Sequence, residues 1–157
     1  MAPRKTLGMI VAAAALVAGQ FAVGNASAAP AQASPLQQKV DTFLEQHPEA
    51  RQTSRNTVDF PGGSATIAEP GATVDRTRAP ACDNGWLCVQ VANGTIYRYY
   101  TCQLYQFRGT GDGTFNNNQS SGTVARFYNQ NGTQRWTNTA KDTGTASWTP
   151  VWSIRPC

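Results

Sequence analysis

Four cysteines in the C-terminal half of the chain constrain its fold more than any other feature of the sequence. They are Cys82, Cys88, Cys102 and Cys157. In an exported protein an even number of cysteines predicts disulfides, and four cysteines allow three pairings. We expect Cys82–Cys88 and Cys102–Cys157, because the Asp-Asn-Gly within CDNGWLC is a turn former that brings the first two sulfurs together. A zinc site is disfavoured, since the chain has no CxxC pair and its single histidine, His47, lies far upstream.

The N-terminus predicts export. Arg4 and Lys5 precede the apolar run LGMIVAAAALVAG, and Ala26-Ser27-Ala28 fits the small-x-small pattern of signal peptidase sites. The alternative, a membrane anchor, needs about 20 apolar residues, and this run is interrupted by Gly and Gln. We therefore predict a signal peptide over residues 1–28 and a secreted, extracellular protein with no membrane-spanning segment after cleavage.

The charge balance gives little reason to expect a nucleic-acid partner. The sequence has 13 basic and 9 acidic residues, and removal of Arg4 and Lys5 with the signal would leave 11 basic residues against those 9. Nucleic-acid binding requires clustered Lys and Arg, and here they are scattered. We expect a monomeric protein that binds neither nucleic acid nor a membrane.

Catalysis is disfavoured by the inventory of titratable groups. Residues 82–157 contain no His and no Glu, and their only acids are Asp83, Asp112 and Asp142, in separate turns. General acid–base catalysis needs titratable groups tuned near the working pH, and glycoside hydrolysis needs two facing carboxylates. His47 follows a helix and is expected to be solvated. We predict that the protein is not an enzyme.

Residues 29–80 are expected to form a helix, short strands and a linker. Ser34 is a suitable N-cap, Pro35 suits the first helical position, and Gln37 completes a capping box. The apolar stripe of this helix comprises Leu36, Val40, Phe43 and Leu44. The segments NTVDF and GSATIAEP are strand candidates, and EPGATVDRTRAPA is a linker, so we place a boundary near residue 80. Two fates remain open for this segment: removal as a pro-segment near Arg76 or Arg78, or docking on the following domain.

Residues 81–157 predict an all-β domain. Strand patterns occur in WLCVQVA, TIYRYYTC, TVARFYN, TQRWT and SWTPVWSIRPC. Asn93-Gly94 and Asn131-Gly132 are hairpin turns, and the units around residues 89–100 and 125–136 suggest a twofold repeat. A sandwich of two four-stranded sheets with Greek-key connections suits this length.

The loop CDNGWLC, the tail WTPVWSIRPC and the stretch FNNNQSSGTVARFY resemble secreted actinobacterial proteins of the metalloproteinase-inhibitor family. The resemblance covers residues 35–157 and implies a βγ-crystallin-like fold that opens on a Cys-x5-Cys loop, here Cys82 and Cys88 with Gly85 between them. It also implies inhibition of an extracellular metalloprotease. The family's reactive residues lie in a second short disulfide loop, which this sequence lacks, so none is carried over.

An inhibitor without that loop must present another segment that is rigid before it binds. The longest candidate is RGTGDGTFNNNQSSG, residues 108–122, in which Phe115 is the apolar side chain. Two interpretations stay open. Phe115 contacts the specificity pocket of a protease, or it packs inward as a core residue.

The same stretch contains a calcium pattern. Asn116, Asn117, Ser120 and Ser121 match the Asn/Asp-Asn/Asp-x-x-Ser/Thr-Ser motif that the resemblance associates with calcium. Calcium prefers such oxygen ligands, but the absence of a carboxylate predicts weak affinity. Calcium is the only cofactor suggested, none is required, and a plain polar turn is the alternative.

The aromatic residues offer a third kind of binding. They are Tyr97, Tyr99, Tyr100, Tyr105, Trp136, Trp148 and Trp152. On one exposed face they would stack on a carbohydrate or cell surface, whereas in a small β domain they usually fill the core. The sequence therefore predicts a secreted binding protein, with protease inhibition as the leading function and calcium or carbohydrate binding as alternatives.

Overall fold

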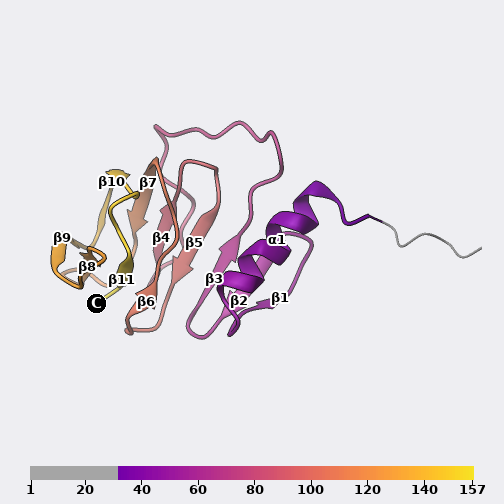
Figure 1. Ribbon diagram of the computed structural model, residues 1–157. Helices are drawn as coiled ribbons and strands as arrows, with labels where there is room; N and C mark the ends of the chain where they lie inside the picture. Colours follow the sequence, from indigo (N-terminus) through magenta and orange to yellow (C-terminus); the bar gives the residue numbers. More distant parts are fainter. Residues whose placement is uncertain (1–31) are drawn as a thin grey trace, which may run out of the picture. The chain divides into compact units, whose positions relative to one another are not determined.

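The computed structural model describes residues 32–157, which form one α-helix and two antiparallel sheets (Figure 1). The signal peptide predicted over residues 1–28 lies outside the described residues. Helix α1 spans Pro35–Gln46. The strands are β1 (Arg51–Gln52), β2 (Thr57–Phe60), β3 (Gly63–Thr66), β4 (Leu87–Gln90), β5 (Ile96–Tyr99), β6 (Tyr105–Gln106), β7 (Asp112–Asn117), β8 (Val124–Tyr128), β9 (Gln134–Thr139), β10 (Asp142–Ser147) and β11 (Ser153–Arg155).

The larger sheet has seven strands in the order β1-β2-β3-β5-β4-β7-β10, and the smaller has four in the order β6-β11-β8-β9. The prediction of a mostly β protein with two antiparallel sheets is confirmed. Residues 81–157 contribute four strands to each sheet, and β1, β2 and β3 extend the larger one. The β domain has two halves, β4–β7 and β8–β11. The third strand of the first half, β6, lies in the smaller sheet with strands of the second half. The third strand of the second half, β10, lies in the larger sheet with strands of the first half.

Residues on either side of position 80 share the larger sheet. β3 pairs with β5, so that Gly63 lies opposite Tyr99 and Ala65 opposite Tyr97. Residues Gln32–Cys157 form one compact unit. Pairing with β3 covers the backbone edge that β5 would otherwise expose, which gives the N-terminal segment a structural role.

The N-cap of α1 forms as the sequence predicts. The Ser34 hydroxyl accepts a hydrogen bond from the Gln37 backbone N–H at 3.1 Å, and Pro35 occupies the first turn. The Gln37 side chain makes no hydrogen bond to the Ser34 backbone N–H, which a capping box requires. Its amide donates to Asp41 Oδ1 at 2.8 Å and to Gln52 Oε1 at 2.9 Å, so that it joins the helix to β1.

The apolar face of α1 docks on the larger sheet. Leu36, Val40 and Phe43 are buried, and the Phe43 ring lies 5.9 Å from the Tyr97 ring. The prediction that His47 is solvated is wrong: it is 7% exposed, because its ring stacks on Phe43 at 4.4 Å. The observed packing therefore favours the docking alternative for residues 29–80.

The two Asn-Gly turns share one backbone-to-side-chain hydrogen bond. Thr95 N–H donates to Asn93 Oδ1 at 2.9 Å, and Thr133 N–H donates to Asn131 Oδ1 at 3.0 Å. Both central glycines have positive φ, 87° and 80°, a backbone region that glycine adopts without strain. These turns close the β4–β5 and β8–β9 hairpins, which begin the two halves of the β domain and support the predicted twofold repeat.

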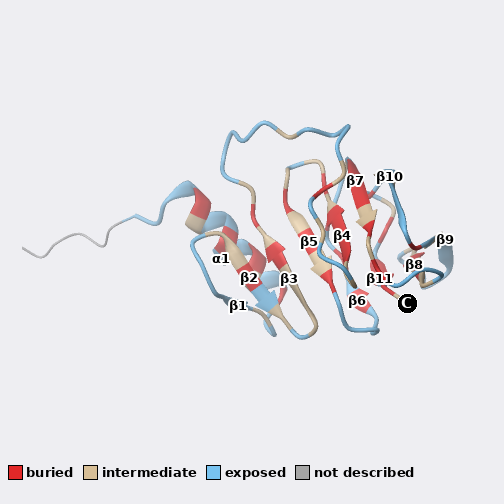
Figure 2. Cartoon of the chain, turned by 180° about the vertical axis from the view of Figure 1, so that it is seen from behind, coloured by how far each residue is buried: buried red, intermediate tan, exposed pale blue. Residues whose placement is uncertain are grey.

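Aromatic residues make up much of the buried core, and buried residues occur in strands of both sheets (Figure 2). Trp136 stacks on Phe127 at 3.8 Å, and Trp148 lies 5.8 Å from Phe127. The Trp148 indole N–H donates to Gln90 O at 2.9 Å, so that its polar atom is satisfied inside the core.

Both predicted disulfides are present. Cys82 pairs with Cys88 and Cys102 with Cys157, with Cα–Cα distances of 5.7 and 5.4 Å. Two disulfides are typical of proteins from an oxidising, extracellular environment. Within residues 32–157 no helix has the length and apolar character that a membrane crossing requires.

The buried tyrosines predict a loss of stability in alkali. Burial raises the pKa of Tyr97 to about 12 from 10.0, so the unfolded chain releases this proton at lower pH than the folded chain does. Stability is therefore retained below pH 10 and falls as the pH rises from 10 to 12. For this residue we expect a loss of about 1 kcal/mol between pH 9 and pH 11, measured by urea unfolding at both pH values.

Tyr97→Phe should reduce that loss, because the variant has no proton to release at this position. Tyr100→Phe is the matched control, since Tyr100 is 60% exposed, and it should lose as much stability as the parent. Equal losses in the parent and in Tyr97→Phe would contradict the assignment.

Candidate functional site

The segment Asp112–Asn117, expected to be part of a long loop, is strand β7, between β4 and β10 in the larger sheet. That expectation is wrong. A glycine-rich, amide-rich segment has low strand propensity, yet Gly113 is required here. A Cβ at Gly113 would overlap Gln90 O and lie 2.8 Å from Trp148 Nε1, so a larger residue would block the Trp148–Gln90 hydrogen bond.

Phe115 points from β7 into the core. It is 5% exposed, and its ring lies 5.8 Å from the Trp136 ring. The prediction that Phe115 contacts a protease is therefore not supported by its position, and the core interpretation holds. The physical reason is strand alternation, because Phe115 and Asn117 share the inner face of β7 while their neighbours face outward.

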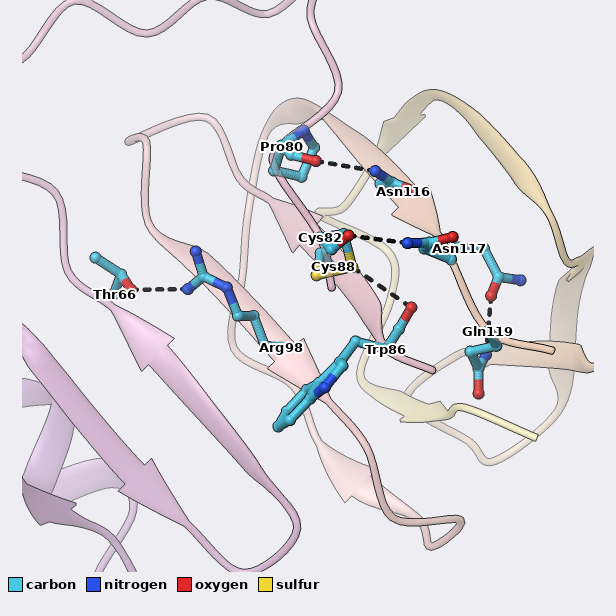
Figure 3. The surroundings of a disulfide bond; sticks show 10 residues. Thr66, Pro80, Cys82, Trp86, Cys88, Arg98, Asn116, Asn117 and Gln119 are labelled. Atoms are coloured by element: carbon cyan, nitrogen blue, oxygen red, sulfur yellow. Dashed lines mark hydrogen bonds between the residues drawn. A yellow bond between two sulfur atoms is a disulfide. The ribbon is translucent and has the colours of Figure 1, made fainter. Parts of the chain in front are cut away.

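The outward side chains of β7 bind the backbone of a preceding segment, residues 75–82, which we call the strap. Thr114 Oγ1 donates to Arg78 O at 3.2 Å, Asn116 Nδ2 to Pro80 O at 3.1 Å, and Asn118 Nδ2 to Cys82 O at 2.9 Å. Figure 3 shows the Asn116–Pro80 bond. Donors and acceptors both advance by two residues, so the strap runs parallel to β7.

The N-terminal part of the strap is held by its own side chains. The Thr77 hydroxyl and N–H both donate to Asp75 Oδ1, at 2.7 and 2.9 Å. These bonds hold the pKa of the Asp75 carboxyl below its usual range. The Arg76 guanidinium donates to Ala92 O at 3.2 Å, which ties this bend to the β4–β5 turn.

The C-terminal end of the strap is held covalently. Cys82 is bonded to Cys88, which lies on the outer face of β4 beside Asn116 of β7. Cys88 is fully buried although it faces outward, and Figure 3 shows the chain around Cys82 lying over this strand. The disulfide predicted from CDNGWLC therefore fixes the strap to the sheet.

The strap is exposed although it is fixed at both ends. Residues 75–78 and Ala81 are exposed, whereas Pro80 is buried against the sheet. An exposed segment with a restrained backbone loses little conformational freedom when a partner binds it. The strap carries two exposed basic residues, Arg76 and Arg78.

The inward amides of this region form a second group of hydrogen bonds. Asn117 Nδ2 donates to Asn138 Oδ1 at 2.9 Å, and Asn117 Oδ1 accepts from Gln119 Nε2 at 2.9 Å. Gln119 Nε2 also donates to Pro156 O at 2.7 Å. Asn117 and Gln119 are buried, so these bonds anchor the C-terminal residues to β7 from inside the domain.

These bonds occupy part of the predicted calcium motif. The amide nitrogen of Asn116 is bonded to the strap and the amide oxygen of Asn117 is bonded to Gln119, while Ser120 and Ser121 are exposed. Among residues 32–157 no group of three or more His, Cys, Asp or Glu side chains is placed to share a metal ion. Calcium binding by Asn116, Asn117, Ser120 and Ser121 stays a prediction.

The aromatic residues do not form a broad exposed platform. Tyr97, Tyr99, Tyr105 and Trp148 are buried, and Trp136 packs against the core. Among the described residues, Tyr100 and Trp152 are the exposed large aromatic side chains. The Tyr100 ring packs on Trp86 at 5.1 Å, and the Arg108 guanidinium lies 5.8 Å from the Trp152 ring. The geometry therefore favours the core interpretation of these aromatics.

Sequence reasoning treated the strap as a linker and did not identify its anchors. One available signal was Phe115 between the polar residues Thr114 and Asn116, an alternation that Asn117 and Asn118 do not continue. Comparison with models of protein families, with curated protein sequences and with solved structures gives no match to this chain.

Phe115→Ala should destabilise the fold, because truncation of a buried phenylalanine leaves a cavity. We expect the free energy of unfolding to fall by about 3–5 kcal/mol, measured by urea denaturation. Thr145→Ala, at an exposed position on the neighbouring strand β10, is the control and should change it by about 0.5 kcal/mol or less. A loss below about 1 kcal/mol for Phe115→Ala would contradict a core position.

Asn116→Ala should loosen the strap, because it removes the donor to Pro80 O. We expect cleavage within residues 76–82 by catalytic amounts of subtilisin to be about five times faster, as the loss of a hydrogen bond of about 1 kcal/mol implies. Mass spectrometry of the fragments identifies the cut. Asn129→Ala, which removes a side-chain bond to Thr133 in the β8–β9 hairpin, should leave the rate unchanged. Equal rates in both variants would show that Asn116 does not restrain the strap.

Proposed function

We propose that this protein is a secreted, monomeric inhibitor of an extracellular protease, and that the strap is the segment it presents. The observation that carries the proposal is an exposed peptide held at both ends before any partner binds. Two side chains of β7 and that of the following Asn118 bind its carbonyls at residues 78, 80 and 82, and Cys82 is covalently bonded to β4. Ordering a mobile loop on binding costs affinity, and the strap avoids most of this cost.

The same anchors would keep the two ends of a cut strap together. On the N-terminal side of the Arg78–Ala79 bond, the Thr114 hydroxyl donates to Arg78 O and the Arg76 guanidinium donates to Ala92 O. On the C-terminal side, Asn116 holds Pro80 O at 3.1 Å. A new amino terminus at Ala79 would stay close to the carbonyl from which it was released, at a high effective concentration. Resealing would then compete with release, and the protease would stay bound.

Arg78 is the side chain best placed to enter a specificity pocket. It is exposed, and among the described residues its guanidinium makes no hydrogen bond, whereas that of Arg76 donates to Ala92 O. A pocket that accepts arginine is acidic, because only a carboxylate satisfies a desolvated guanidinium well. The strap therefore favours a protease with an acidic specificity pocket, whereas the family resemblance favours a metalloprotease. Both classes belong in the test.

The order of the strands supports a βγ-crystallin-like, Greek-key fold for residues 81–157. The halves β4–β7 and β8–β11 each place their second, first and fourth strands side by side, and send their third strand to the opposite sheet. This is the Greek-key order with the third strand folded across. The loop from Cys82 to Cys88 opens the first half, as the resemblance to secreted metalloproteinase inhibitors implies.

Titration of a trypsin-like serine protease and of a thermolysin-like metalloprotease with the purified protein tests the proposal. We expect stoichiometric loss of activity of one of them, with the inhibitor intact or cut at a single strap bond. Arg78→Ala should weaken inhibition at least about tenfold, as expected for the loss of one buried charge-assisted contact of about 1.5–3 kcal/mol. Residual protease activity and mass spectrometry of both chains are the measurements.

Arg135→Ala is the matched control, because Arg135 is an exposed arginine on β9 of the other sheet, and it should inhibit like the parent. Full activity of both proteases with an intact protein would reject the inhibitor proposal. Inhibition that is unchanged in Arg78→Ala would reject the strap as the contact.

A further inference from the structure

Two arginines that are far apart in the sequence lie directly opposite each other on the smaller sheet. The pairing of β8 with β11 places Arg155 beside Arg126. Both side chains belong to the outer face, because their neighbours Phe127 and Ile154 are fully buried and successive side chains of a strand point to opposite faces. At directly opposite positions the Cβ atoms are about 4.5–5.5 Å apart, so the two side chains share one small area of surface.

This arrangement is unfavourable for the fold, because like charges directly opposite on neighbouring strands repel each other. In the larger sheet the charges in register have opposite signs, with Arg51 opposite Asp59. The four strands of the smaller sheet contain no Asp or Glu. Among residues 32–157 neither Arg126 nor Arg155 forms a salt bridge with a side-chain or C-terminal carboxylate. An anion bound between the two arginines would relieve their repulsion.

Most hydrogen-bond donors of the two guanidinium groups are free. The Arg126 guanidinium donates to Val124 O at 3.0 Å, and Arg155 is exposed, while each guanidinium carries five N–H donors. The third arginine of this sheet, Arg135, lies at the bulge of β9 and donates to Asn129 Oδ1 at 3.4 Å, so it is tied to the hairpin turn. Two planar donor groups in one area suit a carboxylate, which accepts two parallel hydrogen bonds from a guanidinium.

The outer face around the two arginines is polar and includes one aromatic ring. On β9, Thr137 lies opposite Arg126 and is exposed. The next outward row across the four strands consists of two amides, a hydroxyl and a phenol, from Gln106, Gln134, Ser153 and Tyr128. Amides and hydroxyls both donate and accept hydrogen bonds, as sugar hydroxyls require, and the half-buried Tyr128 adds an amphipathic ring. The row therefore suits a sugar beside the carboxylate.

We propose that the outer face of the smaller sheet binds an acidic polysaccharide, with the carboxylate of a uronic acid at Arg126 and Arg155 and sugar hydroxyls at the row that contains Tyr128. A nucleic acid fits less well, because its binding rests on many phosphate contacts and this face offers two free cations. A lipid surface fits less well, because membrane binding requires apolar side chains that enter the bilayer, and the two rows contain no Leu, Ile, Val or Phe.

Titration calorimetry of the purified protein with polygalacturonate at low salt tests the proposal. The fully methyl-esterified polymer is the matched control ligand, because it has the same sugar chain without the carboxylates. We expect saturable binding of the acid, at least about tenfold weaker binding of the ester, and weaker binding of the acid as the salt concentration rises. Equal binding of the ester would overturn the proposal. Equal or tighter binding of poly-L-glutamate or duplex DNA would overturn it as well, since neither polymer is an acidic polysaccharide.

Arg155→Gln tests the two arginines directly, because it removes one charge and keeps a polar side chain. We expect polygalacturonate to bind at least about tenfold more weakly. The urea midpoint without ligand should stay the same or rise, since the repulsion with Arg126 is removed. Arg51→Gln, at an exposed arginine of the larger sheet, is the matched control and should bind like the parent.

Equal binding by Arg155→Gln and the parent would overturn the proposal. A lowered urea midpoint in Arg155→Gln would also overturn it, because Arg155 would then stabilise the fold. Protease inhibition is measured separately and involves the strap, so its failure leaves the result with polygalacturonate unaffected.

Discussion

β7 sends alternate side chains to opposite faces of the larger sheet, and the core, the strap and the C-terminal anchor all depend on this alternation. Phe115 and Asn117 face inward, while Thr114 and Asn116 face the strap. A shift of one residue in the pairing of β7 would move the phenylalanine to the outer face and the strap's donors into the core. The hydrogen bonds on both faces therefore fix the register of a strand that contains a single large apolar residue.

The polar interior of this region is tolerated because each amide has a defined partner. Asn117 and Gln119 bond to one another and to backbone or side-chain acceptors of β9 and of the C-terminal segment. Burial of an amide without such partners is costly. The arrangement uses neutral groups throughout, so its strength should depend little on salt, unlike a cluster of surface ion pairs. The side chains that bind the strap carbonyls at residues 78, 80 and 82 are likewise uncharged.

Much of the fold follows from local sequence patterns. Each of these signals lies within a few residues of the element that it predicts. Helix α1 is predicted by the Ser34 cap and the apolar stripe, and β4 by the alternation of Leu87 and Val89. The two hairpins are predicted by their Asn-Gly turns. β10 was not predicted, since its inward positions are occupied by Gly144 and Ala146. The reason lies on another strand: a Cβ at Gly144 would be 3.0 Å from the Phe115 ring.

The candidate sites were harder to predict, because they are formed by residues far apart in the chain. The strap and its donors are separated by the whole of β4, β5 and β6, so no short window of sequence contains both. His47 illustrates the same limit, since a lone histidine at a helix end gives no sign that Phe43 and Phe60 will enclose it.

The strap is held through its backbone carbonyls, and all three donors belong to the region of β7. Every amino acid has a carbonyl, so this anchoring makes no demand on the side chains at positions 78, 79 and 81, whereas Arg76 and Thr77 hold the N-terminal end through their side chains. Substitutions at the first three positions would alter the exposed surface of the strap while its support remains the same. Insertion or deletion of one residue between positions 78 and 82 would instead misalign all the bonds beyond it. The strap should therefore tolerate substitutions at positions 78, 79 and 81 but not changes in length.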